Sequence, residues 1–244
     1  MMNLTTIGFW GAYPEYDEPT SGYLLQTKET NILLECGSGI LTKLYEFIDP
    51  NDLDAVIITH EHMDHCADLM SLYYSVMIQS RLGKRDKPLS VYIPKYMKML
   101  DKYKGEDHLN LYHYDEKSHY DYMGVALNFS KNIHPVEAYA VNFKTDSKKI
   151  TFTGDTELYE NLIDFTAGSD LLISECSLYD TGENSVTGHM SAYEAADLAK
   201  MSHSKELLLT HLPHFGDHED LILNASRNFS GDIYLAGYGL SFEL

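Results

Sequence analysis

The feature that most limits how this chain can fold is a run of metal-binding residue types directly behind an apolar strand. Segment 59–65 reads Thr-His-Glu-His-Met-Asp-His and follows the apolar stretch 55–58. Extended residues two positions apart share a face, so His60 and His62 can point to the same side. Asp64 and His65 come from the turn into a helix and offer an oxygen and a nitrogen ligand. This density predicts a metal site at the end of a strand.

Four residues cannot fill the coordination spheres of two metal ions, so other strand ends must supply further ligands. His134 precedes Pro135, Asp155 follows the strand-like segment 150–154, and His211 follows the apolar segment 207–210. Imidazole and carboxylate ligands together suit zinc, manganese or iron. The predicted ligand set is therefore His60, His62, Asp64, His65, His134, Asp155 and His211.

The rest of the chain alternates short apolar strands with helical patterns, which predicts an α/β fold. The pattern favours strands at 31–35, 55–59, 149–153, 171–175, 207–210 and 233–236. A helix over 64–79 would bury Leu69, Leu72, Tyr73 and Val76 on one face, and Ser191 with Glu194 forms a capping box for a helix to about Ser202. The polar segment 101–123 shows no period, and we expect a surface loop or a lid there.

Composition limits the partners and the compartment. Three cysteines in no Cys-x-x-Cys pair predict no disulfide framework, and no leader-like or membrane-length apolar run is present, so we expect a cytoplasmic protein without a membrane partner. A net charge of -19 disfavours long nucleic acid, whereas a small phosphodiester or nucleotide substrate is compatible because bound cations would offset local carboxylates. A homodimer is also compatible with the sequence.

The order His-x-His-x-Asp-His, then His134, Asp155 and His211, resembles the metallo-β-lactamase superfamily over nearly the whole chain. That resemblance implies a single domain over residues 1–244, folded as an αββα sandwich of two βα halves. It also implies that Asp155 bridges two metal ions. The first ion would be held by His60, His62 and His134, and the second by Asp64, His65 and His211.

A narrower resemblance is to ribonuclease Z. Segment 188–199, GHMSAYEAADLA, is similar to that family's element with a catalytic His outside the metal ligands, which here is His189. Glu175 occupies the place of an acidic residue that contacts this His in the family. The interval between His134 and Asp155 is too short for the protruding tRNA-binding arm, so the sequence is more similar to armless metal-dependent hydrolases and phosphodiesterases.

These observations predict a hydrolase that uses hydroxide from a dinuclear site, with Zn²⁺ as the first choice of metal and Mn²⁺ or Fe as alternatives. We expect Asp64 to orient the attacking water and His189 to stabilise charge or protonate the leaving group. The favoured substrate is a small or cyclic nucleotide or an RNA end. Thioester or lactone hydrolysis, and a metal-binding sensor without turnover, remain alternatives because fold and metals do not fix the substrate.

Overall fold

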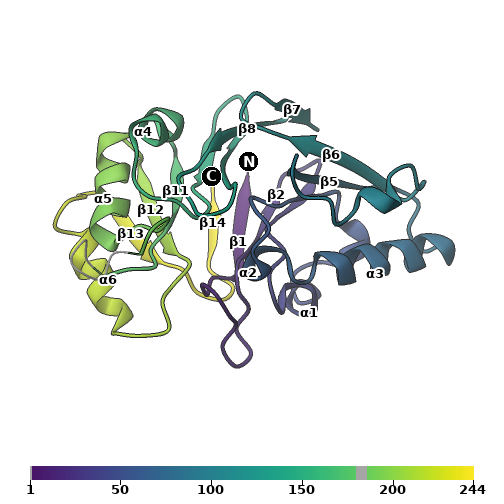
Figure 1. Cartoon of the computed structure of the whole chain (residues 1–244), viewed down its shortest axis with the longest axis horizontal. Helices are drawn as coiled ribbons and strands as arrows, with labels where there is room; N and C mark the ends of the chain where they lie inside the picture. The colour runs from purple at the N-terminus through teal and green to yellow at the C-terminus, as the bar shows by residue number, and fades with distance from the viewer. Residues whose placement is uncertain (1, 180–185) are drawn as a thin grey trace. The chain divides into compact units, whose positions relative to one another are not determined.

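The computed structural model describes residues 2–179 and 186–244, and the chain divides into two compact units. The first unit comprises Met1–Tyr114 and Gly237–Leu244, and the second comprises Asp115–Ala236. Each unit is built around one mixed β-sheet (Figure 1). The α/β class is thus confirmed, while the expectation of one domain over residues 1–244 stays a prediction.

The sheet of the first unit has the strand order β14-β1-β2-β3-β4-β5-β6. Its antiparallel part comprises β14, β1, β2 and β3, and its parallel part runs from β3 to β6. Because β3, β4, β5 and β6 are parallel, the loops that follow their carboxyl ends meet at one edge of the sheet. The strands are β1 (Asn3–Gly8), β2 (Gly22–Gln26), β3 (Asn31–Leu34), β4 (Ala55–Ile57), β5 (Leu89–Pro94), β6 (Leu109–Tyr114) and β14 (Ser241–Glu243).

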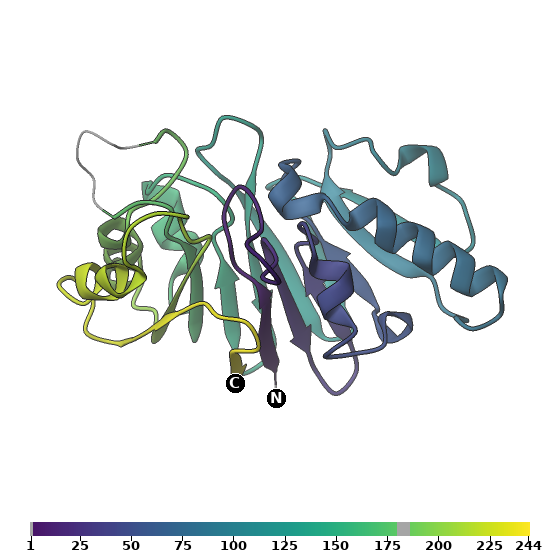
Figure 2. The same ribbon diagram turned by 90° about the horizontal axis from the view of Figure 1, so that it is seen from below.

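Helices α1 and α3 lie along one face of this sheet (Figure 2). The predicted apolar face of α3 is confirmed, because Leu69, Leu72, Tyr73 and Val76 are all buried in the core that the helix shares with the strands. Burying such side chains contributes about 1.5–3 kcal/mol each. The helical segments of the unit are α1 (Ile40–Leu44), η1 (Pro50–Asp52), α2 (Met63–Cys66), α3 (Leu69–Arg81) and η2 (Asp101–Tyr103).

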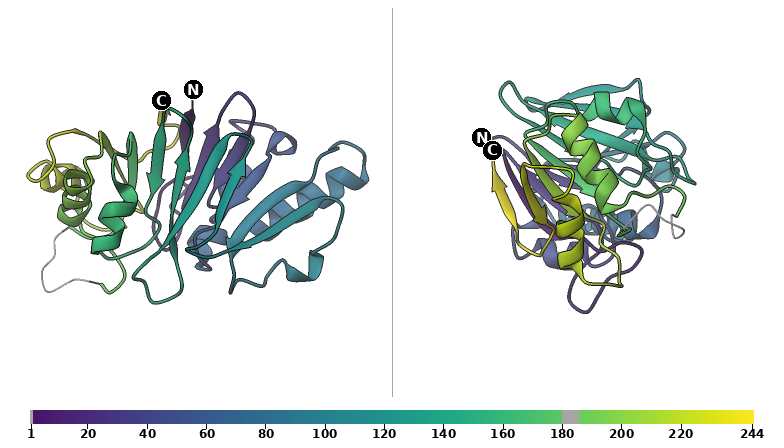
Figure 3. Two further views of the ribbon diagram at one scale, coloured as in Figure 1. Left: turned by 90° about the horizontal axis from the view of Figure 1, so that it is seen from above. Right: turned by 90° about the vertical axis from the view of Figure 1, so that its left-hand side faces the viewer.

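The sheet of the second unit has the order β13-β12-β11-β10-β9-β8-β7, parallel from β13 to β10 and antiparallel from β10 to β7. Figure 3 shows helices α4, α5 and α6 beside its strands. The strands are β7 (His119–Tyr122), β8 (Val125–Lys131), β9 (Tyr139–Lys144), β10 (Lys149–Phe152), β11 (Leu171–Glu175), β12 (Glu206–Thr210) and β13 (Asp232–Leu235), and the helices are α4 (Glu160–Thr166), α5 (Ala192–Met201) and α6 (His218–Ala225).

The capping box that was expected before α5 is present. The side chain of Ser191 accepts a hydrogen bond from the backbone N–H of Glu194, and the Glu194 side chain accepts one from the backbone of Ser191. The six predicted strands are also present, with ends that differ by no more than a few residues. Across residues 2–179 and 186–244, every helix is too short or too polar to cross a membrane.

Two expectations about local structure were wrong. The helix expected over 64–79 is interrupted, because α2 ends at Cys66 and α3 begins at Leu69. Between them, Asp68 makes long-range hydrogen bonds: its N–H donates to Cys36 O (3.0 Å) and its carboxylate accepts from the Leu41 N–H (2.9 Å). Segment 101–123, expected to be a loop or lid, instead contains β6 and β7, each an edge strand of its sheet.

Candidate metal centre

The first unit gathers His60, His62, Asp64 and His65 at the carboxyl end of β4. His60 Nε2 lies 3.1 Å from His62 Nδ1, and His65 Nε2 lies 3.5 Å from Asp64 Oδ2. The hydroxyl of Thr59 lies 3.0 Å from His60 Nδ1, which fixes the ring orientation and leaves Nε2 directed towards the cluster. The predicted motif therefore converges within this unit.

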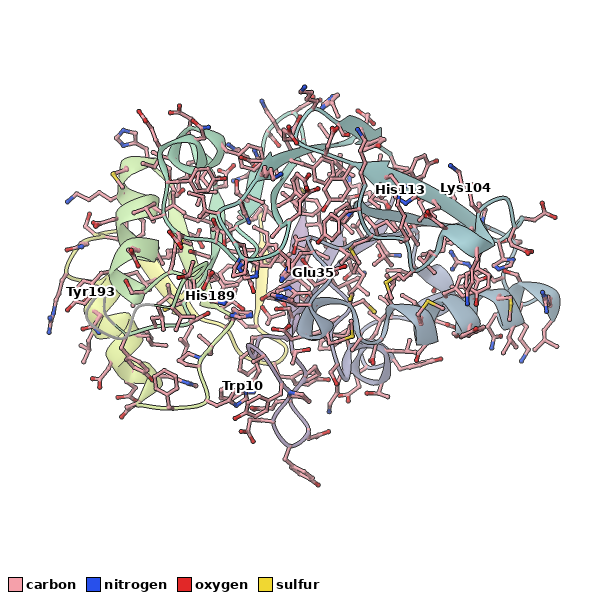
Figure 4. The ribbon with its side chains drawn as sticks, viewed as in Figure 1. Trp10, Glu35, Lys104, His113, His189 and Tyr193 are labelled. Carbon is pink, nitrogen blue, oxygen red and sulfur yellow. The ribbon has the colours of Figure 1, made fainter. Side chains whose placement is uncertain are left out.

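Glu35 is a buried carboxylate beside this cluster that the sequence analysis missed. It follows β3, is completely buried, and has a left-handed backbone φ of 61° (Figure 4). Its carboxylate accepts a hydrogen bond from the Thr59 N–H (3.0 Å) and lies 3.8 Å from His65 Nδ1. Burial raises the pKa of Glu35, while His65 and the hydrogen bonds from Thr59 act in the opposite direction. Glu35 is thus placed to orient the His65 ring.

The loop between β1 and β2 also reaches this cluster. The backbone N–H of Ala12 donates to Asp64 Oδ2 (2.8 Å). Ala12 has φ 62°, and the Tyr13 N–H donates to Gly11 O (2.7 Å), so the chain makes a three-residue γ-turn at this point. A non-glycine residue in the left-handed region is strained, and such strain is typical of functional sites. The turn aims a backbone donor at the Asp64 carboxylate.

The second unit gathers residues that are far apart in the sequence. Asp155 follows β10 and His211 follows β12, and His211 Nε2 lies 3.4 Å from Asp155 Oδ2. His134 contributes a ligand atom within 4.8 Å of one from Asp155. These three predicted ligands therefore converge within the unit. His211 has φ 54°, a further strained residue at the end of a strand.

His189 lies among these residues and is held by a buried carboxylate. Its Nδ1 lies 3.1 Å from Oε1 of Glu175, a residue that is 1% exposed at the end of β11. The Ser177 hydroxyl donates to Glu175 Oε2 (2.8 Å) and also lies 2.8 Å from His211 Nδ1. The expected contact between Glu175 and His189 is present, and Ser177, which the sequence analysis missed, connects that pair to His211.

Gly188 is a position in this unit where only glycine fits. Its φ is 91°, and a Cβ there would come within 2.5 Å of Pro135 Cδ and 2.7 Å of His134 Nδ1. The close approach allows Gly188 O to accept a hydrogen bond from His134 Nδ1 (2.9 Å). That bond fixes the tautomer in which Nε2 carries the lone pair needed by a metal.

The donor atoms of both clusters fit a divalent transition metal. Two ligands held about 2.1 Å from one tetrahedral zinc ion lie roughly 3.4 Å apart. The pairs His60–His62, Asp64–His65 and Asp155–His211 have separations of 3.1, 3.5 and 3.4 Å. Neutral imidazoles and carboxylates are also the ligand types that zinc, manganese and iron accept. Each cluster is therefore suited to a metal.

The cysteines remain poor candidates for ligands, as expected from their sequence context. Cys36, Cys66 and Cys176 are free and buried. Burial raises the pKa of Cys66 to about 12 and also raises the pKa of Cys176. Since the thiolate is the form that binds metals, these buried thiols do not compete with the histidines.

The chain is similar to several known proteins. The family model described as "Beta-lactamase superfamily domain" matches residues 30–212. The protein named "Probable metallo-hydrolase YhfI" from Bacillus subtilis (strain 168) is 36% identical, and the alignment covers 99% of this chain and 100% of YhfI. The crystal structure of YhfI superposes with a TM-score of 0.93, at 35% identity and with 100% and 99% of the two chains covered.

Two further relatives extend the comparison. Ribonuclease Z from Clostridioides difficile (strain 630) is 25% identical, with 100% of this chain and 99% of the relative covered. A crystal structure described as a new diphosphatase from the PhnP family has a TM-score of 0.77 at 18% identity, with 100% and 98% of the chains covered. At that identity the second match shows a shared fold alone.

Proposed function

Because the chain belongs to the metallo-β-lactamase superfamily, with that family's α/β sandwich fold, and is related to ribonuclease Z, we propose that it hydrolyses phosphodiester bonds. The metallo-hydrolase fold, with His and Asp clusters suited to a metal, does not depend on this proposal. The proposed substrate class is a small or cyclic nucleotide or an RNA end.

We further propose that the two clusters supply one dinuclear centre for two divalent cations. Zn²⁺ is the first candidate for these cations. His60, His62 and His134 would bind one cation, Asp64, His65 and His211 the other, and Asp155 both. When bound, two such cations supply Lewis acidity that lowers the pKa of a water molecule and polarises a phosphoryl oxygen. The support for this assignment is the donor spacing in each unit and the family membership.

Within this scheme, Asp64 orients the attacking water. Its Oδ2 is held by the Ala12 N–H (2.8 Å), so the carboxylate keeps one orientation. His189 is the residue that would stabilise charge on the phosphoryl group or pass a proton to the departing alkoxide. Glu175 acts as a positioning residue, since it faces Nδ1 of His189 and directs the opposite ring nitrogen away from itself.

The observation that carries the proposal is the His189–Glu175 pair beside Asp155 and His211. The ligand atoms of Asp155, His189 and His211 all lie within 4.8 Å of one another, so His189 is close enough to act on a group bound there. Its side chain is 19% exposed while that of Glu175 is 1% exposed. A partly accessible imidazole with a buried carboxylate behind it is an arrangement suited to general acid catalysis.

Substitution His189→Ala tests this proposal. We expect the metal content to stay near that of the wild type while kcat on a phosphodiester falls by roughly 10² to 10⁴. The loss should be smaller on bis(p-nitrophenyl) phosphate than on a diester with a poor alkoxide leaving group, because an activated leaving group needs little protonation. Metal analysis beside steady-state kinetics on both diesters measures this.

Two outcomes would contradict the proposal. Loss of metal from the His189→Ala variant would make His189 a ligand, which its position among Asp155 and His211 also allows. Full activity of the variant on every phosphodiester, together with impaired cleavage of a thioester or a lactone, would favour that other hydrolase chemistry.

We also propose that small diesters are cleaved more readily than precursor tRNA. The interval between His134 and Asp155 holds β9 and β10 with the turns beside them. In a ribonuclease Z that processes tRNA, a protruding arm would occupy this interval. A net charge of -19 weakens binding to long RNA at physiological salt. Efficient 3′ processing of precursor tRNA that survives added salt would restore the ribonuclease Z activity instead.

A further inference from the structure

A cavity of about 380 Å³ opens beside His62 in the first unit. Its wall is formed by Glu61, His62 and Met63 on one side and by residues 97–99, Met-Lys-Met, on the other. Both wall segments belong to the same unit. The cavity lies within the range of about 300–1,000 Å³ that small-molecule sites occupy.

The position of the cavity in the sheet points to ligand binding. One wall comes from the loop after β4 and the other from the loop after β5, and these strands pair in parallel. Binding residues are disproportionately found on loops held by a rigid scaffold, and both walls of this cavity are such loops. His62 is shared by this cavity and by the candidate metal ligands, so an occupant would lie next to the reacting group.

The wall chemistry favours a flat aromatic occupant. Three methionines line the cavity, namely Met63, which is 62% exposed, Met97, which is 2% exposed, and Met99, which packs partly on the core. Thioethers make favourable contacts with aromatic rings, and flexible methionine surfaces accept differently shaped groups. The side chain of Lys98 at this wall is 63% exposed, but its Nζ lies 3.7 Å from Asp101 Oδ2 and Glu61 lines the opposite wall, so the methionines and not a net charge carry the recognition.

We infer that this cavity receives the nucleobase of a nucleotide substrate whose phosphate is bound beside His62. The inference rests on the proposed phosphodiesterase function and deepens it by naming the group that is recognised. The methionine walls bury the face of the base. Because thioether groups are weak hydrogen-bond partners for the edges of a base, the site should discriminate weakly between adenine and uracil.

Calorimetric binding of two matched probes to the metal-replete protein tests this inference. Adenosine 5′-monophosphate and ribose 5-phosphate share the sugar phosphate and differ in the base. We expect adenosine 5′-monophosphate to bind about tenfold more tightly, which corresponds to about 1.4 kcal/mol. In the Met63→Gln/Met99→Gln double variant, which keeps side-chain length, this ratio should fall below about threefold.

Met201→Gln is the matched control. Met201 lies on α5 in the second unit and is 44% exposed, so its substitution should leave the tenfold ratio unchanged. Met63→Gln alone changes an exposed side chain and should fold as the wild type does, yet still lower the ratio. A loss of the ratio in the Met201 control, or its persistence in the double variant, would overturn the inference.

A third probe and an activity assay separate the remaining readings. Hexyl phosphate should bind more weakly than adenosine 5′-monophosphate, and equal binding would overturn the nucleobase in favour of an alkyl or acyl chain. If diesters are cleaved but the two matched probes bind equally, the inference fails and the proposed function stands. If the probe ratio depends on Met63 and Met99 but no diester is cleaved, the proposed function fails and the base site stands.

Discussion

Among residues 2–179 and 186–244, each unit holds one buried glutamate, and the two glutamates are held in the same way. Glu35 follows β3 and is 0% exposed, and Glu175 ends β11 and is 1% exposed. The Thr59 N–H donates to Glu35 Oε1 (3.0 Å), and the Thr156 N–H donates to Glu175 Oε1 (2.7 Å). In both cases the threonine follows a neighbouring strand of the same sheet. A backbone donor thus fixes each carboxylate at the end of a strand.

The difference lies in the imidazole that each glutamate faces. Glu35 lies 3.8 Å from Nδ1 of His65, whose ring is completely buried next to Asp64. Glu175 lies 3.1 Å from Nδ1 of His189, whose side chain is 19% exposed. We call each buried glutamate, with the threonine N–H that holds it and the imidazole that it faces, a carboxylate clamp. The carboxylate serves a different task in each clamp. In the first unit it fixes a buried candidate ligand, and in the second it supports the partly exposed ring that we propose acts on the substrate.

The largest effect expected from this comparison follows removal of the buried imidazole. His65→Ala takes a nitrogen ligand from a cluster in which donor spacing fits a metal. We expect the affinity for zinc to fall by more than about 100-fold. This loss exceeds the one caused by removing a residue that only hydrogen-bonds to a metal ligand. Competition with a chromophoric chelator measures this affinity.

His214→Ala is the control for that variant. His214 follows the same strand as His211 but lies outside the two clusters, in the loop after β12, and is half-buried. Its removal should leave zinc affinity unchanged. If His65→Ala bound zinc as tightly as the wild type, the assignment of the buried imidazole to a ligand role would be wrong.

Exchanging each glutamate for glutamine should produce two different losses. Glu35→Gln removes the negative charge behind His65, and we expect zinc affinity to fall by about 10- to 100-fold. Glu175→Gln should leave zinc affinity within about threefold of wild type and lower kcat on a diester by about 10- to 100-fold, because it weakens the support of His189. Parallel chelator titrations and kinetics compare the two variants, and identical profiles would remove the distinction between the clamps.

The clamp of Glu175 and His189 was expected from the resemblance to ribonuclease Z, and the clamp of Glu35 and His65 was missed for a physical reason. Segment 59–65 carries four candidate ligands in one loop, so their proximity follows from chain connectivity alone. Glu35 stands alone between an apolar strand and Cys36, and its contact with His65 arises only when β3 pairs with β4. The signal that could have found it is a glutamate directly behind a buried strand, where an ionised side chain needs a partner.

The fold was predictable where apolar periodicity marks an element and not where an edge strand faces solvent. The central strands are buried along their length, and the expected positions agree with β4, β10, β11 and β12. Exposed and partly buried residues fill β7 and the middle of β6, whose two end residues are buried, because each strand closes one side of its sheet. The resulting polar pattern resembles a loop. The break between α2 and α3 depends on the contacts of Asp68 with Cys36 and Leu41, which local sequence does not reveal.

The smallest expected effect concerns the γ-turn at Ala12, which holds Asp64 in the first unit from outside the clamp. Ala12→Gly keeps the N–H that donates to Asp64 Oδ2 and removes the steric cost of φ 62°. We expect a gain of up to about 1 kcal/mol in the free energy of unfolding, a rise of about 2–4 °C in Tm, and unchanged zinc affinity. Ala12→Val, a β-branched residue that fits this φ poorly, should lower Tm and weaken zinc binding by about tenfold as the donor shifts. Calorimetric melting with a chelator titration measures both quantities. If glycine and valine had the same effect on zinc affinity, the orientation of Asp64 would depend on Glu35 and the strand ends alone, and the turn would be a structural feature of the loop.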